Sequence, residues 1–463
     1  MSIWVAAWLF SAILSAGVYV FCRRAAVPRL PSLILAASAF PAPLLQLIST
    51  SNSFVYALDM VTPLSMWCAF RSWRNCHVSA RRPCVALLVA AGVCPLVVTS
   101  VFSDDRIGLL FDSVNLWRLG GAISILVIFG ALPRAKEAAA EYWLCVFAWP
   151  AIVLSCAMFA QTYGGIDTNV FFHANGQQVP VGQDWEGSGS AVLGLFRAAL
   201  GYISDLAICA YAVGRPRSVA VRWITLIGCC AAFLVCVECG SKTSLIIGLL
   251  LLAYRVWSTR GAYRVVYLVT SLVVVGAGIS TLSSEAVLQS LPVSVARLVK
   301  YHGMESQDLS GRDEIWANAT GAVVADPLIA LGVTRKASMP LGLTSPYVPG
   351  MYHDEYLAVF MLGGFFSLSL YLLYLAILGW TLWHRRNGGW TRKLALTVFF
   401  VGLAQAVTVA HLQPGLIFCC SVSLICAAYG YGCPPRVITP QRAYLAFDGE
   451  WRANGCKADR LRA

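Results

Sequence analysis

Charged residues are scarce in this chain, and their scarcity excludes several classes of protein. Only 12% of the 463 residues are Asp, Glu, Lys or Arg, whereas 58% are apolar and the mean hydropathy is +0.70. Soluble globular proteins are about one quarter charged, so these charges cannot cover several water-soluble domains. A water-soluble enzyme is therefore excluded. The sequence also lacks an internal repeat of fixed period and any low-complexity tract, which excludes repeat architectures.

Cysteine is abundant, but its placement excludes a disulfide scaffold. The 17 Cys residues lie mostly inside apolar runs, as Cys229 and Cys230 do. Thiols in such surroundings act as small hydrophobic groups. The high apolar content excludes intrinsic disorder as well. What remains is a polytopic membrane protein surrounded by membrane lipids.

Long apolar runs occur along most of the chain. A helix needs about 20 mainly apolar residues to cross a membrane, and the runs predict an all-α polytopic protein with 12 or 13 transmembrane helices. The count of 12 is the alternative because three of the runs are weak. Those at 222–239 and 242–256 are short, and the run at 113–132 carries charge. The predicted spans are residues 3–22, 30–49, 54–70, 83–102, 113–132, 142–162, 189–213, 222–239, 242–256, 264–281, 354–383, 394–411 and 415–432.

Lys and Arg gather in one alternating set of loops, which the positive-inside rule assigns to the cytoplasm. These loops hold 25 of the 34 basic residues but only 5 of the 22 acidic ones. The net charge is therefore +20 on that side and −8 over the rest of the chain. The overall charge of +12 is a topology signal, and no nucleic-acid partner is needed to explain it.

Two predicted exterior segments are long enough to contribute to function. The first is rich in Gly, Asn and Gln, a composition suited to hydrogen-bonding a hydroxylated ligand. Parts of the second have helix-like apolar spacing, so we expect a partly helical periplasmic loop. The predicted organisation is a transmembrane bundle at 1–281 with the polar exterior loop near 163–188, the large periplasmic loop at 282–353, C-terminal transmembrane helices at 354–433, and a cytoplasmic tail at 434–463.

Nine basic residues fall outside the cytoplasmic loops, and Arg118, Arg197 and Lys242 among them lie in or beside predicted spans. Ionisable side chains in a bilayer cost about 3 kcal/mol each and commonly mark a polar cavity. An ion pair with Asp112 or with Glu238 is the structural alternative for Arg118, and Lys242 is near a helix end, where snorkelling is easy. Arg197 is predicted two turns inside its span, on the same face as Asp205, which favours a functional cavity.

The most distinctive segments lie in and after the large exterior loop. They read SGRDEIW at 310–316, DPLIALGV at 326–333 and YHDEYL at 352–357. A Ser before two acids is ordinary helix capping, but a cap needs neither Arg312 nor His353. His353 precedes two carboxylates and offers a titratable base. A histidine that merely faces water at the interface is the simpler alternative.

These segments, in this order and followed by an apolar span with Gly363 and Gly364, resemble the C-terminal signature of the bacterial O-antigen ligase and O-antigen or exopolysaccharide polymerase family. The stretch GSKTSL at 240–245 is similar to the family's Gly-Ser-Arg stretch, with Lys242 in place of Arg. The resemblance covers roughly residues 190–430. It implies a GT-C-like membrane glycosyltransferase in the bacterial inner membrane, with its active site facing the periplasm.

The resemblance also implies a reaction that uses no metal ion and no other cofactor. A sugar chain on undecaprenyl diphosphate is the donor, and a saccharide hydroxyl is the acceptor. Cationic groups stabilise a departing diphosphate, and direct displacement inverts the anomeric centre. An exterior acidic pair, Asp104 and Asp105, is the alternative starting point for metal-dependent chemistry. The residues expected to bind the diphosphate are Arg312, Arg197, Lys242 and Arg118, and the expected catalytic residues are His353, Asp354 and Glu355.

Three functions fit this pattern. The predicted one is polymerisation of undecaprenyl-diphosphate-linked repeat units into exopolysaccharide or O-antigen. The alternatives are an O-antigen ligase, which transfers polysaccharide to lipid A-core, and an export or flippase protein. Transporters often have internal symmetry, which this chain lacks. A chain-length regulator and a flippase of the same pathway are expected as protein partners.

Overall fold

The computed structural model describes residues 3–39, 57–74, 76, 78–102, 106–132, 137–166, 168, 192–193, 195, 197–239, 241–259, 265, 312–331, 355–383 and 389–407. Over these residues the structure is 87% α-helical, and none of them forms a strand. The predicted all-α class is therefore confirmed. The predicted spans at 264–281 and 415–432 and the tail at 434–463 lie outside the described residues, apart from Val265.

Four described helices are long and apolar enough to cross a membrane. They are Val5–Arg24, Tyr142–Thr162, Val219–Glu238 and Gly363–Trp380. Shorter apolar helices cover Leu119–Phe129, Ala199–Val213 and Thr243–Ser258. The chain is thus a helical membrane protein, as its composition predicts, while the count of 12 or 13 crossings stays a prediction.

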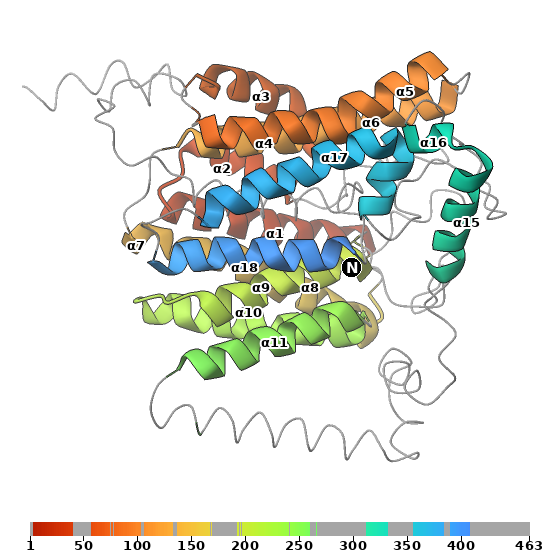
Figure 1. Cartoon of the computed structure of the whole chain (residues 1–463). Coiled ribbons are helices and arrows are strands. Elements are labelled where there is room, and N and C mark those ends of the chain that lie inside the picture. The colour runs from red at the N-terminus through yellow and green to blue at the C-terminus, as the bar shows by residue number, and fades with distance from the viewer. Residues whose placement is uncertain are drawn as a thin grey trace, which may run out of the picture.

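The helices form two groups, which meet where α1 packs against α8 and where α17 packs against α18 (Figure 1). The second group has α8 at its centre, packed against α1, α9 and α10. α8 is apolar on all sides, which is typical of a helix that is buried in a protein core or crosses a membrane. The first group is α1 (Ile3–Arg24), α2 (Arg29–Ser38), α3 (Ala57–Ser72), α4 (Val78–Leu88), the π-helix η2 (Val89–Val93), α5 (Cys94–Phe102), α6 (Arg106–Gly130) and α17 (Glu355–Trp383). The second is α7 (Glu137–Ala140), α8 (Tyr142–Thr162), α9 (Arg197–Val213), α10 (Val219–Glu238), α11 (Lys242–Ser258) and α18 (Gly389–Ala406).

Small residues allow α8 to approach its neighbours closely. A methyl group on Gly228 of α10 would lie 2.6 Å from the Cβ of Ala148, and one on Gly17 of α1 would overlap the Trp149 indole. The Trp149 indole N–H donates a hydrogen bond to the carbonyl of Ile13 at 3.1 Å. Close backbone approach through small residues is how helices associate in membranes, where the hydrophobic effect between them is weak.

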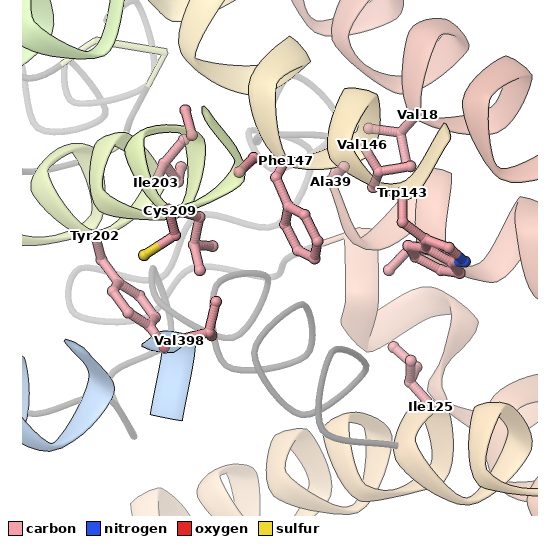
Figure 2. Packing of buried hydrophobic residues seen from close by; sticks show 14 of the residues in the cluster. Val18, Ala39, Ile125, Trp143, Val146, Phe147, Tyr202, Ile203, Cys209 and Val398 are labelled. Carbon is pink, nitrogen blue, oxygen red and sulfur yellow. The ribbon is translucent and has the colours of Figure 1, made fainter. Parts of the chain in front are cut away.

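One continuous apolar core joins the two groups, and Figure 2 shows part of it. Ile125 of α6 lies on one side of this view, and Tyr202 of α9 beside Val398 of α18 on the other. At one end of the bundle, Arg255 donates to the carbonyl of Gly214 at 3.1 Å. The connection between α9 and α10 is therefore fixed to the end of α11 that carries basic residues, which is the end predicted to face the cytoplasm.

Two further helices, α15 (Arg312–Ala325) and α16 (Leu328–Leu331), lie beyond the other end of the bundle, next to the beginning of α17 (Figure 1). The predicted large loop is helical in this part. The span predicted at 354–383 corresponds to α17, which has non-helical backbone at Gly363 and Gly364. Gly364 has φ of 66° and ψ of −163°, a conformation that is essentially restricted to glycine. The kink separates a short arm, residues 355–362, from the long membrane helix.

Candidate functional site

Three of the four residues predicted to bind diphosphate each begin a helix. Arg197 begins α9, Lys242 begins α11 and Arg312 begins α15. The N–H groups of a first helical turn lack intrahelical partners and carry partial positive charge, so helix starts favour anions. The side chains of these three residues lie outside the described part of the structure. Their proposed contacts with diphosphate stay predictions.

The prediction that Arg197 lies two turns inside its span is wrong. The helix starts at Arg197, and the residues before it include an isolated bridge between Val192 and Leu195. Leu193, between them, has φ of 51°, which an α-helix cannot contain. Arg197 is therefore at the end of α9 and needs no opening inside the bundle to reach the exterior side.

The beginnings of α9 and α11 are in close contact. A methyl group on Gly201, one turn after Arg197, would lie 2.6 Å from Ser244 Oγ and 2.7 Å from Ser241 Oγ. Gly248, two turns along α11, makes a second close approach, because its added methyl would be 3.0 Å from Ile208 Cδ1. Glycine at both places lets the helices touch. The two cationic residues thus begin neighbouring helices whose backbones are held together.

A buried polar cluster lies at this contact. Asp205 of α9 is 0% exposed, and its Oδ2 accepts a hydrogen bond from the side-chain amide of Gln405 on α18. The same amide donates to Ser244 Oγ at 2.9 Å, and the Ser241 hydroxyl also donates to Ser244 Oγ at 2.9 Å. Within the described residues, Asp205 Oδ1 has no hydrogen-bond partner. The thiol of Cys236 on α10 lies beside this cluster, next to Ser244.

The predicted catalytic residues lie at the beginning of α17. Glu355 is its first residue, with only its backbone described, and His353 and Asp354 lie outside the described residues. The arm of α17 packs on α15 and α16 through a separate apolar cluster. That cluster consists of Ala319, Ala322, Val323, Ile329, Leu357, Phe360 and Met361. The helix that starts at Arg312 and the arm that starts at Glu355 are therefore parts of one packing unit.

Tyr356 links this unit to the second group of helices. Its hydroxyl donates to the carbonyl of Leu403 in the last turn of α18, at 3.5 Å. Gln405, which bonds to Asp205, follows Leu403 by two residues. The last turn of α18 therefore contacts both the arm of α17 and the polar cluster at the start of α11.

Arg118 is separated from the other predicted diphosphate-binding residues. It lies in α6, which packs against α2, α3, α4, η2 and α5, whereas α9 packs against α8, α10, α11 and α18. Its side chain lies outside the described residues, as does that of Asp112. The described packing brings Arg197 and Lys242 together and leaves Arg118 in the other helix group.

No group of three or more His, Cys, Asp or Glu that could hold a metal ion occurs in the described part of the chain. The last turn of α10 does carry a Cys-x-x-Cys segment, Cys236 and Cys239, and both thiols are 0% exposed and reduced. The Cys239 thiol donates to the carbonyl of Cys236 at 3.7 Å. Buried thiols of this kind are unreactive and contribute to packing.

Sequence reasoning missed Gln405 and Ser244. The available signals were a side-chain amide inside the predicted span 394–411 and a hydroxyl in the family-like GSKTSL stretch. Neither signal shows which partner each residue has.

No protein-family model matches the chain, and no curated protein matches it either.

Proposed function

We propose that this protein is a membrane glycosyltransferase that joins saccharide repeat units carried on undecaprenyl diphosphate, at the outer face of the bacterial inner membrane. The observation that supports this proposal most directly is the contact between the starts of α9 and α11. Two cationic residues, Arg197 and Lys242, begin these helices, and Gly201 brings the helices together. Two helix starts and two cations suit a ligand with two adjacent phosphate groups.

The chemistry requires little more than placed charges and a base. The oxygen of the acceptor hydroxyl forms a bond to the anomeric carbon while the bond from that carbon to the diphosphate oxygen breaks. Undecaprenyl diphosphate leaves with the electron pair of the broken bond. The cations Arg197, Lys242 and Arg312 stabilise this charge as it develops. His353 accepts the proton of the acceptor, with Asp354 or Glu355 orienting its imidazole.

The charge distribution supports an outer site. Basic residues collect on the predicted cytoplasmic side, and the remainder of the chain has a net charge of −8. A cation retained on that remainder opposes the positive-inside rule and therefore serves another purpose, such as binding an anion. A lipid-linked diphosphate in the outer leaflet is an anion of suitable size and location.

The experiment is deletion of the gene in its host, followed by analysis of lipid-linked saccharides. Polymerase function predicts that single repeat units accumulate on undecaprenyl diphosphate in the outer leaflet. Long chains that stay on the lipid would instead indicate a ligase, and single units trapped in the inner leaflet would indicate a flippase. Either result overturns polymerisation.

Complementation of the deletion strain then tests the residues. Arg312→Ala, Arg197→Ala and His353→Ala are expected to abolish polymer without changing the amount of protein in the membrane. The matched control is Arg222→Ala, at the exposed start of α10 near the opposite end of the bundle. Full polymer from Arg312→Ala or His353→Ala contradicts the proposed site.

A further inference from the structure

The buried carboxylate of Asp205 has a role that packing alone does not explain. Asp205 is 0% exposed inside a membrane bundle, and no described basic side chain forms an ion pair with it. Placing an acidic side chain inside a membrane helix costs about 3 kcal/mol or more. A side chain that served only to fill this space would be apolar. The carboxylate is retained for its interactions.

Those interactions join three helices that are far apart in sequence. The amide of Gln405 on α18 bonds to both Asp205 on α9 and Ser244 on α11. The polar side chains of this set therefore come from three different helices.

The start of α11 is suited to a carboxylate. Ser241 precedes the helix without a side-chain cap, because its hydroxyl donates to Ser244 Oγ. The first-turn N–H groups of α11 therefore receive no side-chain cap from Ser241. Asp205 supplies a carboxyl group to the cluster from a neighbouring helix. One of its oxygens, Oδ1, has no partner among the described residues, and such atoms are rare in purely structural networks.

We propose that Asp205 is a positioning residue for the transferase reaction. Acting with Gln405 and Ser244, it fixes the first turn of α11, and hence Lys242, against the first turn of α9, which begins at Arg197. The starts of α9 and α11 lie close together because Gly201 has no side chain. Both cations then meet the same diphosphate group in the orientation that stabilises its departure. This inference rests on the proposed function.

The test is a comparison of steady-state kinetics in full-length protein reconstituted in lipid vesicles. The donor is the lipid-linked repeat unit extracted from the deletion strain. Asp205→Asn keeps the shape of the side chain but replaces one carboxyl oxygen with an amide nitrogen, which disturbs the hydrogen bond with Gln405. We expect kcat to fall about 100-fold, the order of loss that small misplacement of catalytic groups causes. KM for the donor should change much less, because a displaced clamp loses interactions chiefly in the transition state.

Glu141→Gln is the matched control. Glu141 is another buried carboxylate, 4% exposed, and it accepts a hydrogen bond from the Ser218 N–H at the opposite end of the bundle. Its replacement makes the same change from carboxyl to amide at a buried place and is expected to leave kcat unchanged. Wild-type kcat in Asp205→Asn overturns the positioning role, and so does an equal loss of kcat in Glu141→Gln.

A swap variant covers the case in which Asp205→Asn does not fold. Asp205→Ser combined with Ser244→Asp returns the carboxylate to the same cluster from α11, at a helix start that favours it. We expect the swap to recover turnover relative to Asp205→Ser alone, and no recovery in a folded swap protein overturns the inference. Failure of the proposed function is recognised separately, because then the wild-type protein does not use the extracted donor.

Discussion

Replacing Gly364 with Ala tests whether the kink in α17 holds the predicted catalytic segment in place. At φ of 66° and ψ of −163°, an alanine has its Cβ in conflict with its own backbone, which costs about 1–3 kcal/mol. The helix can avoid this strain only by straightening. Straightening withdraws the arm from α15 and α16, so Met361, 5% exposed in its present position, loses its contacts. Losing that burial costs about 2 kcal/mol.

The two costs are similar, so the arm is expected either to remain in place under strain or to detach. Both outcomes weaken the packing of residues 355–362. Hydrogen–deuterium exchange of the full-length protein in nanodiscs measures this, and exchange over 355–362 should be faster in Gly364→Ala than in wild type. Polymer formation in the complemented deletion strain should fall with it, because the arm that begins at Glu355 is held less firmly against α15 and α16.

Gly321→Ala is the control for this experiment. Gly321 lies within α15, and a methyl group there meets nothing within 4 Å. Alanine in a helix interior is stabilising relative to glycine by about 0.5–1 kcal/mol, so this variant should keep or improve stability, arm protection and polymer yield. Gly364→Ala with wild-type exchange and wild-type polymer refutes the assigned role of the kink.

Three other substitutions test the helix contacts. Gly201→Leu should lower the thermal midpoint and abolish polymer, because overpacking costs about 1–3 kcal/mol and separates α9 from α11; an active, stable variant contradicts the close contact. Glu141→Gln should destabilise the protein by about 1–2 kcal/mol, measured by thermal unfolding, since the Ser218 N–H loses a charged acceptor. Gly228→Leu should prevent accumulation in the membrane, detected by immunoblot, because its side chain meets the Ala148 backbone.

The sequence predicts helices best where one physical signal dominates. The run at 142–162 coincides with α8, Tyr142–Thr162, because a mainly apolar run of this length forms a membrane helix even though it contains Pro150. The start of α9 was predicted eight residues too early, at 189 rather than Arg197. Residues 189–196 are apolar enough to extend the run, but hydropathy contains no information on the positive φ of Leu193.

At the candidate site, too, the sequence identifies local features but not long-range contacts. Arg197, Lys242, Arg312 and Glu355 were singled out by charge and motif, and each proves to be the first residue of a helix. The bond between Gln405 and Asp205 spans 200 positions of sequence, so no local periodicity predicts it. Long-range polar pairs of this kind depend on which helices pack together, and a single sequence does not specify that.

The last turn of α18 contacts both regions that the proposed reaction requires. In that proposal the cations on the diphosphate and the base on the acceptor lie within the length of one sugar linkage, so α11 and the arm of α17 must keep a fixed relation. α18 contacts both, through Gln405 to Ser244 and through Leu403 to Tyr356. A shift of α18 along its axis would therefore move the two halves of the site together rather than apart. The carboxylate of Asp205 resists that shift because it bonds Gln405 from a helix that α18 packs against.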